Sequence, residues 1–80
     1  MLVTRPDRRI FVSNKLTEFE QGVFYAAAIV QITADQPGIA ADIVKSAGLH
    51  NHDCSELDEM DKEALRVVNR EKGMSLKGLN

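Results

Sequence analysis

The residues most able to do chemistry in this 80-residue chain lie together in residues 50–56, which read His-Asn-His-Asp-Cys-Ser-Glu. Imidazole, thiolate and carboxylate groups are the usual protein ligands of zinc, so His50, His52 and Cys54 are candidate metal ligands. Their spacing matches no established zinc pattern, such as paired Cys-x-x-Cys. We therefore expect a polar loop without a metal or another cofactor, in which Asp53 caps the following helix and Cys54 is a small buried residue.

Cys54 is also a candidate nucleophile. A thiol at a helix N-terminus near two histidines can have a lowered pKa, and a cysteine–histidine pair is a known catalytic arrangement. The sequence shows no glycine-rich loop or oxyanion site to accompany such a nucleophile. It therefore favours a protein that is not an enzyme.

A central helix over residues 17–34 must position this loop. Residues 17–20 read Thr-Glu-Phe-Glu, which is the pattern of a capping box at a helix N-terminus. Apolar residues then recur at helical spacing and predict the centre of the buried face: Phe19, Val23, Ala26 and Val30.

Phe24 and Tyr25 make this helix apolar on nearly every side, because Phe24 lies among its polar residues and Tyr25 widens the apolar face. Such a helix is either wrapped by the rest of the protein or paired with another copy. A short chain has little material for wrapping, so we expect a homodimer with Phe24 and Tyr25 at the contact, and a monomer after Phe24→Glu. The alternative is an ordinary core helix with Phe24 half exposed.

Two further helices are expected after the central one. Pro37 suits the first turn of a helix over residues 37–47, and Gly48 suits its end. A third helix is expected over residues 53–72, beginning at Asp53 or Ser55 as its cap.

The two ends of the chain complete the predicted fold. Residues 1–14 contain two short β-prone runs and predict an extended arm or a β-hairpin, whereas residues 74–80 predict a frayed tail. The sequence therefore predicts one mostly α-helical domain of three helices.

Charge is distributed unevenly along the chain, although the net charge is only −2. An acidic run in the third helix is either a solvated face or a docking surface for a basic patch on a partner: Glu56, Asp58, Glu59 and Asp61. The N-terminal segment is basic, and its Arg5, Arg8 and Arg9 could contact nucleic-acid phosphates. The acidic third helix would be repelled by DNA, so nucleic acid is the less favoured partner.

Composition indicates the cytoplasm. A single cysteine allows no disulfide within the chain, and no apolar run reaches the roughly 18 residues of a membrane span. The N-terminal arginines are followed by no apolar stretch of the kind found in signal peptides. We expect a cytoplasmic protein without a membrane partner.

The helical segments resemble small proteins carried by tailed phages and prophages of enteric bacteria. The resemblance covers roughly residues 16–68 and is carried by five short runs: TEFEQGV at 17–23, DQP at 35–37, AADI at 40–43, AGL at 47–49 and DKEAL at 61–65. Most such proteins have no known function, and the resemblance transfers no functional residue. It implies a bacterial cytoplasm and an accessory role, either binding a host protein or regulating phage genes.

These observations favour a non-enzymatic protein-binding or regulatory module acting on a host protein. The alternative from another class is a nucleic-acid-binding regulator that uses the N-terminal arginines together with the basic end of the third helix, from Arg66 onward. A small metal-binding or cysteine-dependent protein built on His50, His52 and Cys54 is the third.

Overall fold

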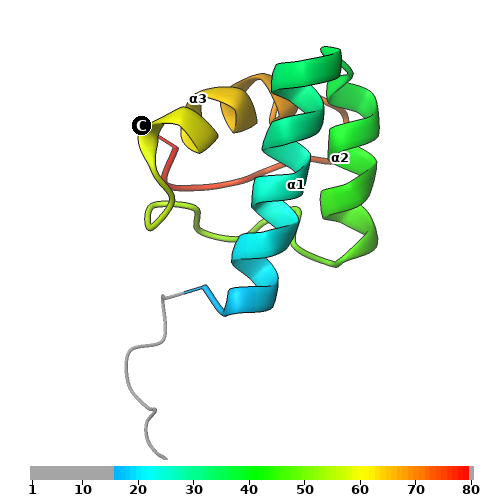
Figure 1. Ribbon diagram of the computed structural model, residues 1–80. Helices are drawn as coiled ribbons and strands as arrows, with labels where there is room; N and C mark the ends of the chain where they lie inside the picture. The colour runs from blue at the N-terminus through cyan, green and yellow to red at the C-terminus, as the bar shows by residue number, and fades with distance from the viewer. Residues whose placement is uncertain (1–15, 80) are drawn as a thin grey trace, which may run out of the picture.

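A computed structural model describes residues 16–79, which form three α-helices (Figure 1). They are α1 (Glu18–Ala34), α2 (Pro37–Ser46) and α3 (Glu59–Val68). Within this part of the chain there is no strand, and the one isolated β-bridge joins Asp53 to Lys77 in parallel. The predicted small three-helix domain is thus confirmed. The predicted arm or hairpin over residues 1–14 lies outside the described residues.

The capping box at the start of α1 is present as predicted. The Thr17 hydroxyl accepts a hydrogen bond from the Glu20 amide at 3.1 Å, and the Glu20 carboxylate accepts one from the Thr17 amide at 2.9 Å. Both orphan amides are therefore satisfied within one turn. At the other end, Asp35 ends α1 in a left-handed conformation with φ of 51°.

The second helix also follows its local signals. Pro37 occupies its first turn, where the missing amide costs nothing. Gly48 follows the helix with φ of 75°, and the Leu49 amide donates to the Val44 carbonyl at 3.0 Å. Leu49 is buried beneath this turn, so glycine and leucine together form the predicted stop.

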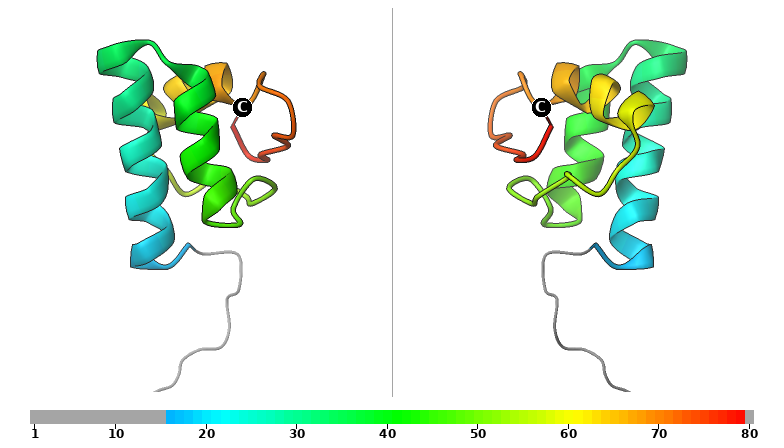
Figure 2. Two further views of the ribbon diagram at one scale, coloured as in Figure 1. Left: turned by 90° about the vertical axis from the view of Figure 1, so that its right-hand side faces the viewer. Right: turned by 90° about the vertical axis from the view of Figure 1, so that its left-hand side faces the viewer.

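The core lies where α1 meets both other helices (Figure 2). Its five largest fully buried side chains are Phe24, Leu65, Val44, Val68 and Cys54. The helices otherwise meet through small residues, namely Ala27, Ala28, Ala40, Ala41 and Ala64. Alanine at these positions allows the helix backbones to approach closely.

The buried face of α1 was predicted incorrectly. It lies roughly a quarter turn around the helix axis from the predicted face, which is the rotation between consecutive residues. Phe24 is fully buried, whereas Phe19 and Ala26 from the predicted stripe are exposed. Both arcs of α1 are apolar, so helical periodicity alone could not choose between them. The proposed contact role of Phe24, and the monomer expected from Phe24→Glu, are corrected: that change would place a charge in the core.

The third helix is shorter than the predicted 53–72. Its N-cap is Asp58, whose carboxylate accepts from the Asp61 amide at 2.9 Å, and not Asp53 or Ser55. Asp53 instead accepts from the Ser55 amide at 2.9 Å and so forms a local turn. Short polar side chains of this kind compete with helix formation, which explains the delayed start.

The C-terminal segment is ordered, not frayed. Leu76 and Leu79 are buried in the core, and the segment passes behind α1 in Figure 1. The Lys77 amide donates to the His52 carbonyl at 3.0 Å, and the Cys54 amide donates to the Lys77 carbonyl at 2.7 Å. This pairing could not be predicted from local sequence patterns, because the two paired segments are far apart in the chain.

Gly78 is required where the C-terminal segment crosses the turn at Asp53. Its φ is 74°, and an added Cβ would lie 2.7 Å from the Ser55 amide nitrogen and would clash with the Asp53 carboxylate. We expect Gly78→Ala to lower the free energy of unfolding by about 1–3 kcal/mol. Chemical denaturation followed by circular dichroism measures the change.

Gly38→Ala is the matched control for this prediction. Gly38 lies within α2, outside any proposed contact surface, and an added Cβ would meet only the Glu71 carboxylate, at an ordinary 3.6 Å. That change should raise the free energy of unfolding by roughly 0.5–1 kcal/mol, because glycine is a poor helix former. Equal effects of the two changes would contradict a specific steric demand at Gly78.

Candidate functional site

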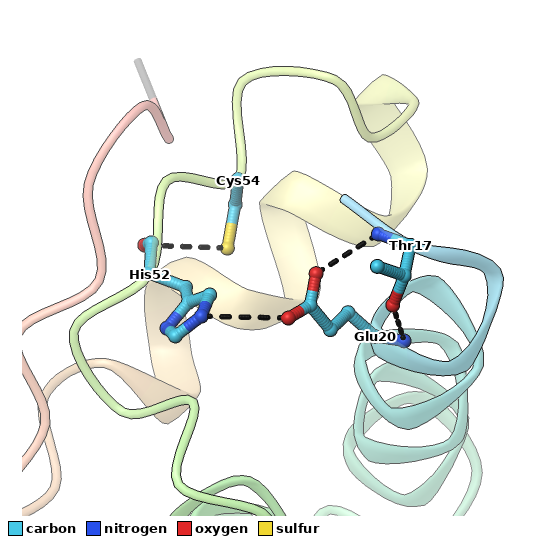
Figure 3. Close-up of polar contacts among 4 residues, drawn as sticks. All are labelled: Thr17, Glu20, His52 and Cys54. Atoms are coloured by element: carbon cyan, nitrogen blue, oxygen red, sulfur yellow. Dashed lines mark hydrogen bonds and ion pairs between the residues drawn. The ribbon is translucent and has the colours of Figure 1, made fainter. Parts of the chain in front are cut away.

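The loop that contains the candidate metal ligands is tied to the start of α1 through Glu20 (Figure 3). One oxygen of the Glu20 carboxylate caps α1, and the other lies 3.6 Å from His52 Nε2. The Cys54 thiol lies 3.9 Å from the His52 carbonyl oxygen. His52 and Glu20 therefore connect two segments of the fold, which is a structural role.

No metal site is formed by the residues that the structure describes. Among residues 16–79, no three histidine, cysteine, aspartate or glutamate side chains are placed to hold one ion together. The carbonyl groups of His50 and His52 instead accept backbone hydrogen bonds from Ser75 and Lys77. The loop thus serves as the partner of the C-terminal segment.

Cys54 is a small buried residue, as expected, and the alternative of an activated thiol is not supported. Burial, together with the negative charge of Asp53, raises the pKa of Cys54 to about 12. Cys54 also lies five residues before α3 begins, so it gains nothing from the helix dipole. Since the thiolate is the reactive form, the geometry does not support a nucleophile here.

Cys54 should therefore resist alkylation in the folded protein. Its side chain is fully buried, and a thiol with a pKa near 12 is almost wholly protonated at mildly alkaline pH. We expect iodoacetamide to label it at least about a hundredfold more slowly than in urea-unfolded protein. Mass spectrometry over time measures this ratio, and labelling at the unfolded rate would contradict the buried position.

The four acidic residues proposed as a docking surface do not form one exposed face. Asp61 is only 9% exposed, and Asp58 caps α3 through the Asp61 amide. Glu59 forms an ion pair with Arg66 at 2.8 Å, whereas Glu56 is exposed in the preceding turn. The predicted interaction role of Asp61 is corrected, because its side chain is buried at the base of α3.

Asp61 and Asp53 are perturbed in opposite directions. Burial, with a smaller contribution from the charge of Asp58, raises the pKa of Asp61. Hydrogen bonds from the Ser55 amide and hydroxyl lower the pKa of Asp53. The stability that Asp61 contributes is thus present below the ordinary carboxyl pKa and is lost as pH rises through its folded pKa, whereas that of Asp53 is lost as pH falls.

These directions predict opposite pH dependence for two matched variants. Relative to wild type, Asp61→Asn should gain stability as pH rises from about 3 to about 6, because it removes a buried carboxylate. Asp53→Asn should lose relative stability over the same interval. Urea denaturation at several pH values gives both differences, and parallel curves for the two variants would contradict the assignment.

The structure describes only some of the basic residues proposed for nucleic-acid binding. Arg5, Arg8 and Arg9 lie outside the described residues. Arg66, near the end of α3, pairs with Glu59 and donates from its Nε to the Leu79 carbonyl. The Arg66 guanidinium therefore has a structural role, because it joins α3 to the C-terminal segment.

Of the five large hydrophobic residues that are exposed in the described part of the chain, three lie on α1 and point away from the core. Phe19, Tyr25 and Ile32 are 69%, 57% and 49% exposed on this side. Gly22 and Ala26, both exposed, lie between them. We call these five residues the outward face of α1. Of the two aromatic residues predicted at a contact, Tyr25 is part of this face and Phe24 is not.

Comparison with known proteins gives no assignment. No protein-family model, curated protein or solved structure matches the chain. Among the described residues, no helix is both long and apolar enough to cross a membrane.

Proposed function

We propose that this chain is a non-enzymatic protein-binding module that makes its contacts through the outward face of α1. The observation that carries the proposal is the exposure of Phe19, Tyr25 and Ile32 along one side of the longest helix. Single exposed apolar residues are common, but three large ones aligned on one helix face are typical of contact surfaces.

The chemistry of this face suits another helix. Its five residues carry no charge, although the exposed Glu18 lies on the same side of α1, seven residues before Tyr25. Away from that end, a partner gives up few strongly hydrated groups when it binds. An added Cβ at Gly22 would meet no heavy atom within 4 Å, which leaves room for a second backbone to approach. Aromatic side chains beside such a gap are common centres of binding energy.

The partner that this face fits best is a second copy of the chain. A two-fold symmetric contact requires one patch to be complementary to itself, and a stripe whose only flanking charge on α1 is Glu18 at its N-terminal end meets that requirement. In this proposal the homodimer is an accessory protein of a phage or prophage that acts on a host protein in the bacterial cytoplasm. That assignment is supported by the resemblance of residues 16–68.

Replacing one residue of the outward face by an acid should disrupt the dimer. We expect Tyr25→Glu to give a monomer at concentrations where the wild type is dimeric, because two buried carboxylates would face each other across the axis. Asn51→Glu, at an exposed turn on another part of the surface, should leave the dimer intact. Size-exclusion chromatography with light scattering distinguishes the two states.

A wild-type protein that is monomeric at high micromolar concentration would contradict the homodimer. The host-protein role is tested by pull-down from a nuclease-treated bacterial lysate with wild type, Tyr25→Glu and Asn51→Glu as baits. One host protein retained by the wild type and Asn51→Glu but not by Tyr25→Glu would support it. Retention that disappears with nuclease treatment would contradict it.

A further inference from the structure

A groove lies between the C-terminal half of α1 and α3 and adjoins the outward face at Ile32. It has a volume of about 500 Å³ and a mainly apolar lining. Ile32, Ala64 and Val67 contribute to that lining together with Met60, which is 68% exposed. An exposed methionine is well suited to a contact surface because its side chain adapts its shape.

The open edge of this groove is acidic. Asp35 from the end of α1 and Glu63 from α3 both line it, and both are exposed. The last turn of α1 contains no basic residue, so nothing there offsets the negative end of the helix dipole. α2 and α3 differ in this respect, because each has a basic residue in its last turn.

A polar atom in the groove also lacks a partner. Gln31 donates from Nε2 to the Asp35 carboxylate at 3.0 Å, and this contact fixes the orientation of its amide. Its Oε1 is buried and accepts no hydrogen bond from residues 16–79. A buried acceptor of this kind is satisfied when a ligand supplies an N–H donor.

From these features we infer that the groove binds a protein segment in which a lysine or arginine adjoins a leucine-like aliphatic side chain. The aliphatic group packs on Ile32, Met60 and Val67. The cation lies between Asp35 and Glu63, where it offsets both carboxylates and the helix dipole. A donor from the same segment reaches Gln31 Oε1. This inference deepens the proposed protein-binding function and rests on it. The groove shares Ile32 with the outward face that pairs two copies, but its other lining residues lie outside that face.

The test uses the full chain and a fluorescein-labelled hexapeptide with arginine at positions 2 and 5, leucine at positions 3 and 4 and serine at both ends. Two control peptides replace both arginines by glutamate or both leucines by serine. We expect anisotropy to show binding of the first peptide alone. Amide shift changes in an NMR titration should be largest at Ile32, Ala64 and Val67.

Charge reversal at Glu63 provides the decisive variant. Glu63→Lys should weaken peptide binding about five- to tenfold, because attraction becomes repulsion at one end of the groove. Glu56→Lys changes the net charge equally at an exposed position outside the groove and should weaken binding less than about twofold. Met60→Gln should weaken binding without altering the preference for arginine over glutamate. Equal losses for the two charge reversals would overturn the inference, because net charge alone would explain them.

Two further results separate this inference from its alternatives. If replacing Arg8 and Arg9 by glutamate increases peptide affinity about tenfold, the chain's own basic segment competes for the groove. That result would overturn the inference that the groove binds a segment of another protein. Tyr25→Glu should leave peptide binding unchanged, and Glu63→Lys should leave the oligomeric state unchanged. A wild-type protein that is monomeric but binds the peptide would therefore contradict only the pairing through the outward face. A wild-type protein that is dimeric but does not bind the peptide would contradict only the groove.

Discussion

The close approach of α1 to both other helices is the constraint on which this structure depends. It is possible because alanine occupies the contact on every helix: Ala27 and Ala28 on α1, Ala40 and Ala41 on α2, and Ala64 on α3. Larger side chains at these positions would separate the helix axes and leave Phe24 and Leu65 without close neighbours.

This constraint has a consequence for the surface. Because α1 uses small residues to contact its neighbours, several of its large side chains are left on the opposite side. Phe19 and Tyr25 are more than half exposed, whereas Ala27 and Ala28 are completely buried. That distribution is the reverse of the usual preference of residues for the interior. It is understandable if the outward face of α1 is buried in an assembly, as the proposed function requires.

Local signals in the sequence predicted local structure well. Thr17 and Glu20 cap α1, Pro37 begins α2 and Gly48 follows its end, since each of these residues acts on backbone groups within a few positions. The side of α1 that faces the core was not predictable in this way, because two arcs of the helix are apolar and packing decides between them.

The late start of α3 and the ordered C-terminal segment also depend on contacts between distant parts of the chain. The candidate site likewise combines features that local sequence predicts with features that depend on contacts between distant residues. Tyr25 could be proposed as a contact residue from its place on an apolar helix, and the structure shows that it is exposed. The α1–α3 groove could not, because Asp35 and Glu63 come together only when two helices are packed. The alternative of a nucleophile at Cys54 is unsupported for a related reason, since burial of the thiol raises its pKa.

The bridge between Asp53 and Lys77 has a consequence for cooperativity. It closes a loop that contains the whole of α3, a helix of 10 residues that would be marginal as an isolated peptide. Arg66 and Asn69 tie that helix and its end to the same C-terminal segment, through the carbonyls of Leu79 and Leu76. The second half of the molecule therefore behaves as one opening unit, in which α3 cannot unwind without releasing the segment that closes the loop.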